Sequence, residues 1–461
     1  MKRRNGIQRG VVYVLAMVLL AVLTSVAVTV VGATGLSVRS SGNYATVNQA
    51  RMTAESGQRY LLGQVQAITL PYSTNATNFL ANLSTALGTR LNGTANLAGQ
   101  TVGLSGSTIV IPTIQTPDGS FSGQITWLGN DVSRLEVTGW AGEVSRTVVM
   151  NMLLGPKSSG VFDYGIASRG KIVIKGNATF DGMTLHEEAN VLSTKSTPVA
   201  IEAGGSAYIG GDLSVTGEEG DYVLISGRGL SIGGTSEINE IVTEHVHLGV
   251  DDPEWPVIDS APLIPFATNV ITSSNPPAGT YNNIRIPANT NATFGGDTVI
   301  NGVVYVEAPN NVAFTSKTVI NGIIVTEEDY NESITACSID FRGQVTAPGP
   351  GALPETLEWA PIRAYAGSVM LAPSFELRFR GATNSINGTI AADELSFLGN
   401  STISGTVNGS ILGLKNLPLT LSGSCTIRVD KLNSTKFPPG FIHPRGLTAL
   451  AETYAELAPT E

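Results

Sequence analysis

The segment NATFGGDTVINGVV at residues 291–304 is followed by NVAFTSKTVINGII at residues 311–324, an offset of 20 residues. Each copy contains a short apolar strand, a turn of small or polar residues and a second strand. One coil of a parallel β-helix has this pattern, because stacked coils bury each other's apolar faces. The repeat therefore predicts a mainly β fold whose C-terminal part is a parallel β-helix solenoid.

Residues one repeat apart should lie beside each other, since stacked strands are about 4.8 Å apart. We therefore expect a repeat core of four inward-pointing residues: Phe294, Ile300, Phe314 and Ile320. Asn301 over Asn321 is expected to form an amide ladder at the turn. An antiparallel meander is the structural alternative. The repeat favours the β-helix, because a meander has no reason to repeat a motif in one direction.

Related motifs and proline-rich stretches extend and interrupt the repeat. NATF recurs at residues 177–180, and SINGTI at 385–390 is followed by TISGTV at 402–407. Prolines are concentrated in residues 251–290 and 347–374. Because proline removes a donor from the strand ladder, we predict lateral loops in these two stretches.

These boundaries give a repeat domain at residues 161–440 and a C-terminal tail at residues 441–461. An open end of a β-helix must be covered to prevent edge pairing. The tail is therefore expected to form a brief helix over the last coil.

An uncharged apolar run, VVYVLAMVLLAVLTSVAVTVV, occupies residues 11–31. About 20 apolar residues span a bilayer as a helix, so we predict a single transmembrane helix at residues 11–34 of an inner-membrane protein. Four basic residues precede it: Lys2, Arg3, Arg4 and Arg9. By the positive-inside rule, the N-terminus is cytoplasmic and the C-terminal body is periplasmic or extracellular. A signal peptide cleaved at VGATG, residues 31–35, is the alternative, but its apolar core is typically only about 7 to 15 residues long.

Residues 35–160 are predicted to form a stalk domain. Small and apolar side chains recur every three or four residues across 47–68, as on one face of an amphipathic helix, and Pro71 ends this pattern. A second short helix fits residues 79–91. Strand-like segments separated by glycine, aspartate and asparagine turns follow between 108 and 154, which predicts a small antiparallel sheet beside the helix.

The N-terminus combines QRG at residues 8–10, directly before the uncharged helix, with AESG at residues 54–57. This combination resembles the N-terminus of PilX-like type IV pilus assembly proteins. In that family a basic leader ending in glycine is the prepilin peptidase site, and the helix behind it packs into the pilus or pseudopilus core. The resemblance implies a leader at residues 1–10, cleavage between Gly10 and Val11, and other pilin-like subunits as partners of the helix.

Further segments extend the resemblance. LEVTGWAGEVSRTV at residues 135–148 is similar to the β-region that follows the helix in PilX-like proteins, and residues 160–177 and 436–441 are similar to the repeat domain fused behind such N-termini. Two positions differ from the major-pilin pattern: Val11 replaces an aromatic residue and Leu15 replaces a glutamate. These differences imply a minor, priming or tip-like role. An ordinary single-span anchor is the alternative.

Charge is distributed unevenly along the chain. The net charge is -10, and after the leader there are 23 basic and 37 acidic side chains. Such a body has no electrostatic reason to bind nucleic acid. The sequence contains no phosphate-binding G-x-x-x-x-G-K-[ST] loop, no G-x-S-x-G elbow and no C-x-x-C pair. We therefore expect neither an enzyme nor a bound cofactor.

A few polar residues could carry chemistry. His245 and His247 alternate along a predicted strand, with Glu244 on the other face, so both imidazoles should face one side, as in a metal site. A surface pair is favoured, because the chain has only four histidines. Acidic clusters at residues 218–221 and 251–254 have the chemistry to bind Ca²⁺ or cleave sugars, but solvated turns explain them more simply.

Cys337 and Cys425 are the only cysteines, and each lies in a strand-like segment. Their separation of 88 residues corresponds to about four coils, or about 19 Å along the stack, which is beyond the reach of a disulfide. We expect two separate buried thiols.

These features together favour a non-enzymatic structural or assembly component of a type IV pilus-like or pseudopilus system in the bacterial envelope. Its expected partners are the inner membrane and other pilin-like subunits. A membrane-anchored adhesin or polysaccharide-binding β-helix protein is the second interpretation, with a polysaccharide as its partner. A polysaccharide lyase or hydrolase is the third, and it requires carboxylates clustered with arginine or lysine.

Overall fold

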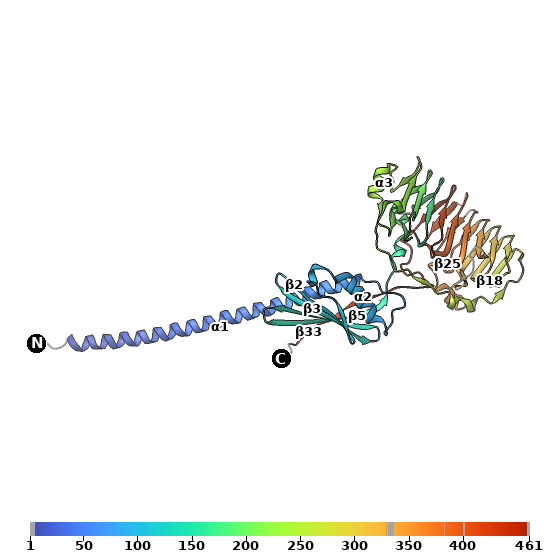
Figure 1. The fold of residues 1–461 in the computed structure, drawn as a ribbon. Coiled ribbons are helices and arrows are strands. Elements are labelled where there is room, and N and C mark those ends of the chain that lie inside the picture. The colour runs from blue at the N-terminus through green and yellow to red at the C-terminus, as the bar shows by residue number, and fades with distance from the viewer. Residues whose placement is uncertain (1–4, 329, 331–335, 382, 400–401, 459–461) are drawn as a thin grey trace. The chain divides into compact units, whose positions relative to one another are not determined.

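A computed structural model describes residues 5–328, 330, 336–381, 383–399 and 402–458. The chain divides into two compact units (Figure 1). The helix–sheet unit comprises Met1–Gly155 and Arg445–Glu461, and the parallel-strand unit comprises Pro156–Pro444. The second unit is thus inserted in the sequence of the first, between two strands of its sheet.

The helix–sheet unit contains two helices and a six-stranded sheet. The helices are α1 (Asn5–Ala67) and α2 (Phe79–Leu91), followed by the short 3₁₀ helix η1 (Ala95–Leu97). The sheet has the order β1 (Gly103–Ser105), β2 (Thr108–Thr116), β3 (Gly119–Gly129), β4 (Val132–Ala141), β5 (Val144–Pro156) and β33 (Arg445–Leu457). Strands β1 to β5 pair antiparallel. The predicted long helix with a small antiparallel sheet is therefore confirmed.

The second half of α1 packs on β3 and β4 through small and apolar side chains. Its fully buried residues include Ala50, Ala54, Leu61 and Val65. A Cβ atom at Gly139 of β4 would lie 2.3 Å from the backbone nitrogen of Ala54. Helix and sheet thus approach so closely that the contact depends on a residue without a side chain.

The C-terminal tail is a strand of this sheet, so the predicted brief helix over the last coil is wrong. Strand β33 lies beside β5 and covers its edge. At its start, the amide of Leu70 donates to the carbonyl of Arg445 at 2.8 Å, and the amide of Arg445 donates back at 2.9 Å. Pairing an otherwise open sheet edge outweighs the local helical preference of an alanine- and glutamate-rich segment.

The parallel-strand unit is built around a 25-stranded sheet in which every pair of known register is parallel. Its strands are β6 (Ile166–Ser168), β7 (Ile172–Ile174), β8 (Thr179–Gly182), β9 (Val191–Ser193), β10 (Ile201–Gly204), β11 (Tyr208–Ile209), β12 (Leu213–Val215), β13 (Val223–Ser226), β14 (Ser231–Ile232), β15 (Val246–His247), β17 (Asn269–Val270), β18 (Gly279–Ile286), β19 (Thr293–Phe294), β20 (Thr298–Val306), β21 (Asn311–Phe314), β22 (Thr318–Thr326), β23 (Ser338–Phe341), β24 (Val345–Ala347), β25 (Ser368–Phe379), β26 (Thr383–Ile386), β27 (Thr389–Phe397), β28 (Thr402–Val407), β29 (Ile411–Gly413), β30 (Leu419–Leu421) and β31 (Thr426–Val429). The predicted body of parallel strands is confirmed.

Short elements complete this unit. A two-stranded antiparallel pair joins β16 (Val257–Ile258) and β32 (Phe441–Ile442). The short helices are η2 (Gly160–Asp163), η3 (His186–Ala189), η4 (Gly220–Tyr222), α3 (Ile238–Glu244), η5 (Ala261–Phe266), η7 (Pro350–Ala352) and α4 (Ala360–Arg363).

Strands β20 and β22 follow the 20-residue offset of the sequence repeat. They pair residue by residue from Thr298 with Thr318 to Val306 with Thr326, which places Ile300 beside Ile320. Both isoleucines are fully buried.

A column of aromatic rings fills the interior of these strands. Its members are Phe294, Phe314, Phe341, Phe379 and Phe397. Neighbouring rings are stacked, with centroids 4.9, 5.3, 5.1 and 4.7 Å apart in that order. At the turn, the amide of Asn301 donates to Asn282 at 2.9 Å, and the amide of Asn321 donates to Asn301 at 3.0 Å.

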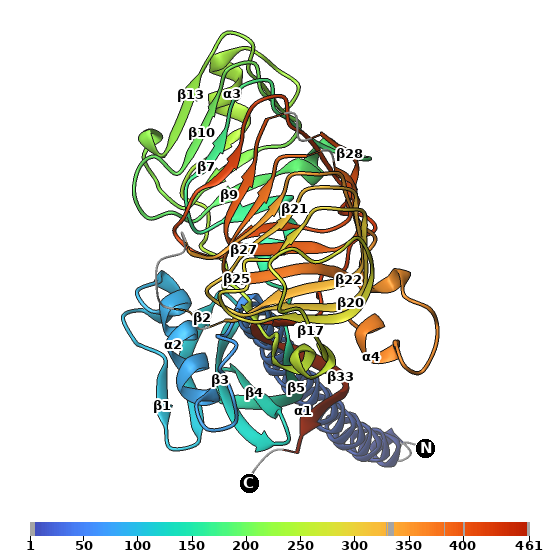
Figure 2. The ribbon, with the colours of Figure 1, turned by 90° about the vertical axis from the view of Figure 1, so that its right-hand side faces the viewer.

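The strands do not stack in simple chain order. Strands β29, β30 and β31, the last of the sheet, pair with β6, β7 and β8, the first. The red strands accordingly lie between the green and the orange ones (Figures 1 and 2). The last repeat is therefore internal to the stack, which explains why no tail helix is needed to cover it. The ends of the stack are formed by β13–β15 and by β17–β19.

The two segments predicted as loops, 251–290 and 347–374, each contain part of the sheet. Strand β18 lies within the first, and β25 begins within the second. Around β18, the prolines precede or follow the strand and so remove no ladder donor. In β25, Pro373 lies where the register with β27 shifts between Ala372 and Glu376, and such an irregularity tolerates proline.

The junction between the first and last repeats is held by the buried Glu188 and the partly buried Lys431. The carboxylate of Glu188 accepts hydrogen bonds from four backbone amides, at 2.8 to 3.2 Å: those of Thr184, Leu185, Lys431 and Leu432. The ammonium of Lys431 donates to the carbonyl of Phe162 and to the hydroxyl of Ser410. These contacts join segments more than 240 residues apart in sequence.

Lys431 should make the stability of the parallel-strand unit depend on pH. Burial lowers the pKa of Lys431 from 10.5 to about 8, against the raising effect of Asp163 and Glu188. The unfolded chain therefore binds more protons than the folded chain between about pH 8 and pH 10.5, so stability rises with pH in this window by at most about 1.4 kcal/mol per pH unit. The urea midpoint of the full chain minus that of Lys431→Met should increase between about pH 7.5 and pH 9.5.

Tryptophan emission can follow this unfolding, because Trp255 and Trp359 are buried in the parallel-strand unit. Lys317→Met is the matched control, since Lys317 is exposed. The difference between the parent and this control should not change with pH. The assignment would be contradicted if the difference for Lys431→Met were equally constant.

Candidate functional site

The first part of α1 is an apolar helix surface without contacts to the rest of the described chain. Every residue from Val11 to Ala45 is exposed. Within the described residues, α1 is the one helix long and apolar enough to cross a membrane. An apolar surface of this length must be covered by lipid or by other apolar helices.

Four hydroxyl groups on this surface are satisfied by the helix itself. Those of Thr24, Ser25, Thr29 and Thr34 donate to backbone carbonyls three or four residues earlier. No charged side chain occurs between Val11 and Val38. The surface therefore has no charged side chain that would need water or an ionic partner.

The residues predicted for processing lie at the start of this surface. Gly10 and Val11 both belong to α1, at the boundary between the basic leader and the apolar run. Leu15 presents an exposed aliphatic side chain where major pilins carry a carboxylate. Cleavage between Gly10 and Val11 stays a prediction.

A network of ion pairs between side chains links α1 to the sheet where the two meet. Arg51 lies 2.9 Å from Glu55 and 3.6 Å from Glu456, and Arg146 lies 3.4 Å from Glu456. The hydroxyl of Tyr454 donates to Glu55 at 3.0 Å. The hydrogen bond from Arg51 lowers the pKa of Glu55. Sequence reasoning missed this network, because it placed the tail that carries Tyr454 and Glu456 over the last coil of the repeat domain.

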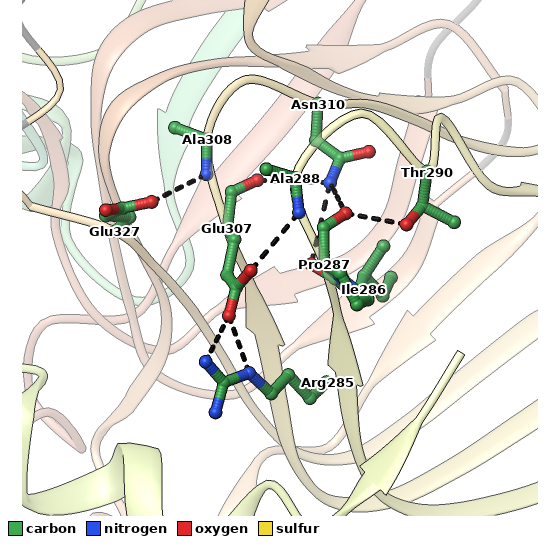
Figure 3. Close-up of polar contacts among 9 residues, drawn as sticks. All are labelled: Arg285, Ile286, Pro287, Ala288, Thr290, Glu307, Ala308, Asn310 and Glu327. Atoms are coloured by element: carbon green, nitrogen blue, oxygen red, sulfur yellow. Dashed lines mark hydrogen bonds and ion pairs between the residues drawn. The ribbon is translucent and has the colours of Figure 1, made fainter. Parts of the chain in front are cut away.

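A second set of polar groups lies at one corner of the parallel strands (Figure 3). The carboxylate of Glu307 accepts from the amide of Ala288 at 3.2 Å, and that of Glu327 accepts from the amide of Ala308 at 2.9 Å. Both contacts repeat with the 20-residue offset of the sequence. Each glutamate thus holds the turn of the preceding repeat.

The neighbouring side chains at this corner are also bound to the chain itself. The guanidinium of Arg285 donates to Glu307 at 2.6 Å and lies over the ring of Tyr305. The amide of Asn310 donates to the carbonyl of Pro287 at 2.6 Å and to that of Glu307 at 3.1 Å (Figure 3). Because these groups hold backbone and one another, we assign the corner a structural role.

The two candidate metal-binding histidines share a carboxylate instead. His245 Nδ1 lies 2.7 Å from one oxygen of Asp212, and His247 Nε2 lies 2.9 Å from the other. Burial favours a raised pKa for Asp212, but the hydrogen bonds from His247 and His245 outweigh it and lower the pKa. Of the two, only His247 lies in a strand, because His245 ends the short helix α3. The predicted strand alternation is therefore wrong.

An open pocket lies beside this pair. Its lining includes Asp163, Asp212, Asp251 and His247 but, among the described residues, neither lysine nor arginine. A polysaccharide-cleaving site, as envisaged above, gains no support from such a lining. No group of three or more histidine, cysteine, aspartate or glutamate side chains in the described part of the chain is arranged to hold a metal ion.

The remaining acidic candidates lie on the surface. Glu218, Glu219, Asp221, Asp251 and Asp252 are exposed. Both cysteines are buried thiols, as expected, and each immediately precedes a strand, Cys337 before β23 and Cys425 before β31.

Comparison with known proteins identifies the N-terminal segment. Residues 9–59 match the family described as PilX N-terminal. This segment is similar to a PilX-type N-terminus. It contains Gly10, Val11 and the whole exposed apolar run, and it ends where α1 packs on the sheet.

Beyond the PilX-type segment, the comparisons are less informative. The crystal structure of the competence-associated pilin ComZ from Thermus thermophilus is similar over 90% of this chain and 98% of that chain, at 12% identity and a TM-score of 0.24. This TM-score is too low to support a conclusion about the fold or the function. A search of curated protein sequences gave no match.

Proposed function

We propose that this protein is a non-enzymatic structural or assembly component of a type IV pilus-like or pseudopilus system in the bacterial envelope. The observation that carries the proposal is the first part of α1, an uninterrupted exposed apolar surface inside the PilX-type segment. Such a surface suits both states of a pilin-like subunit, because it can be covered by lipid before assembly and by neighbouring helices afterwards.

In this proposal the leader determines whether the helix stays in the lipid bilayer or packs against neighbouring helices. Residues 1–10 carry four positive charges, which hold the N-terminus on the cytoplasmic side of the inner membrane. Cleavage between Gly10 and Val11 removes these charges. The remaining helix then has no charged side chain before Arg39 and can leave the bilayer for a core of similar helices.

Leu15 supports a minor role. A carboxylate at this position would need a polar partner in an apolar core, whereas leucine packs without one. The subunit thus has no electrostatic contact at the position where the major-pilin pattern has one, which fits a priming or tip-like position.

We further propose that the parallel-strand unit is a β-helical solenoid presented outside the inner membrane. The supporting observations are the in-register parallel pairs at a 20-residue offset and the column of stacked phenylalanine rings. Each coil buries apolar side chains against its neighbours, as a solenoid requires.

Cross-linking through α1 tests the proposed function. Val18 is exposed on the apolar run, and both native cysteines are buried, so Val18→Cys introduces one reactive thiol. In cells that assemble filaments, oxidation should join this thiol to a cysteine placed on the N-terminal helix of a pilin-like subunit. Immunoblotting after non-reducing electrophoresis would detect the product.

Leu357→Cys provides the matched control, because Leu357 is exposed and belongs to the parallel-strand unit instead of the apolar run. It should give no such product. If Val18→Cys also gave none while filaments formed, α1 would be a plain membrane anchor and the proposed function would be wrong.

A further inference from the structure

One end of the parallel-strand stack has an open strand edge. Strand β13 pairs with β10 and, among the described residues, with no other strand. The carbonyl of Tyr222 accepts from the amide of Ala200 at 2.8 Å, and that of Ser226 accepts from the amide of Gly205 at 3.0 Å. Since the backbone groups of successive strand residues point to opposite edges, those of Val223 and Ile225 face the open edge.

The apolar interior is also incompletely covered at this end. The side chains of Val223 and Ile225 are only partly buried against the core, whereas their partners in β10, Ile201 and Ala203, are fully buried. Helix α3 covers part of the end by inserting Ile241. Around it, four large apolar side chains are 39% to 51% exposed: Leu224, Ile238, Val242 and Leu248.

At the opposite end of the stack, an aromatic side chain packs on the interior. There the ring of Tyr281 lies edge-on against Phe294, with centroids 5.7 Å apart, and its hydroxyl donates to the carbonyl of Pro277 at 2.6 Å. The ring of Tyr281 thus covers part of the apolar interior at that end.

The segment that forms the β13 end is strongly acidic. Residues 218–248 contain six acidic side chains and one basic side chain, Arg228. Two copies of such an end repel each other, and charges near an edge strand are a known means of preventing self-pairing. A segment of opposite charge would instead be attracted and oriented.

We propose that this end binds an extended, basic polypeptide segment of a partner protein, added in β-conformation to the open edge of β13. Its backbone would pair with the free groups of Val223 and Ile225. Alternate side chains, being apolar, would cover the partly buried interior. The others, lysine or arginine, would face the surrounding acidic residues, because successive side chains of a strand point to opposite faces.

Peptide binding to the full chain in detergent tests this inference. The probe is a fluorescein-labelled peptide of alternating lysine and valine, followed by anisotropy. Glu219→Lys combined with Glu244→Lys reverses two exposed charges at this end and should raise the Kd at least about tenfold. Glu355→Lys combined with Glu358→Lys makes the same charge change elsewhere in the unit and should raise the Kd less than about twofold.

A second probe separates strand addition from simple charge attraction. The same peptide with alternate backbone amides methylated keeps its charge but cannot pair with β13, so its binding should be lost. The inference would be overturned if the methylated peptide bound as tightly, or if both double variants weakened binding equally. It would also be overturned if Leu224→Cys formed disulfide-linked dimers of the chain itself, because a second copy would then be the occupant.

Discussion

Replacing Gly10 with leucine is expected to leave the chain at full length in the membrane. A bulky side chain at the cleavage position prevents the close approach of a peptidase that glycine permits. Insertion should be unaffected, because the apolar run from Val11 onward is unchanged and still long enough to span a bilayer. The mature form should fall from the major species to an undetectable one, as measured by intact mass of the purified protein.

Gly6→Leu is the matched control for this experiment. It makes the same substitution within the leader, four residues before the cleavage position, and keeps all four positive charges. Processing of this variant should remain normal. A Gly10→Leu protein that still began at Val11 would refute the assigned cleavage site.

The second large effect is expected in the parallel-strand unit, where Ile320→Asp should unfold the neighbouring repeats. Ile320 is fully buried and pairs with Ile300. An aspartate there would be a charge without a partner in an apolar interior, which costs about 3 kcal/mol or more. Urea unfolding of the full chain should show a markedly lower midpoint, or no cooperative transition of this unit.

Val319→Asp tests whether the inward face is assigned correctly. Val319 is the preceding residue on β22 and is only partly buried, since successive strand residues point to opposite faces. Its substitution should cost about 1 kcal/mol or less. If the two variants had equal stability, the assignment of Ile320 to the interior would be wrong.

The sequence repeat predicts local pairing well, because a fixed offset dictates which residues stack. The pairs of β20 with β22, including Ile300 beside Ile320, follow directly from 20 residues between copies. The apolar periodicity of α1 and the turn residues between β2 and β5 are local signals in the same way.

Strand pairings between segments far apart in the sequence have no such fixed offset, so the sequence did not predict them. The junction of β29–β31 with β6–β8 joins segments without a shared offset, and Glu188 and Lys431 hold it from far apart in sequence. The same holds for β33, which pairs with β5 because that edge needs a partner. A helical composition in the tail concealed this strand, and with it the network of Arg51, Glu55 and Glu456.

The functional features likewise include some that consecutive residues predict and some that depend on contacts between distant segments. The apolar run and the leader charges are read from consecutive residues, so the exposed part of α1 was predictable. The open edge of β13 was not, because it depends on where the stack ends, and the stack ends in the middle of the repeat sequence. The carboxylate shared by His245 and His247 likewise comes from Asp212, which precedes β12 and is 33 and 35 residues away.

The N-terminus of the wild-type protein, purified from its native host and determined by intact mass with N-terminal sequencing, tests the central proposal most directly. A pilin-like subunit should begin at Val11, because assembly requires removal of the basic leader and retention of the apolar helix. A protein beginning at Met1 or Lys2 would be only a membrane anchor. One beginning near Gly35 would have lost the helix as a signal peptide, and either result would contradict a role in pilus assembly.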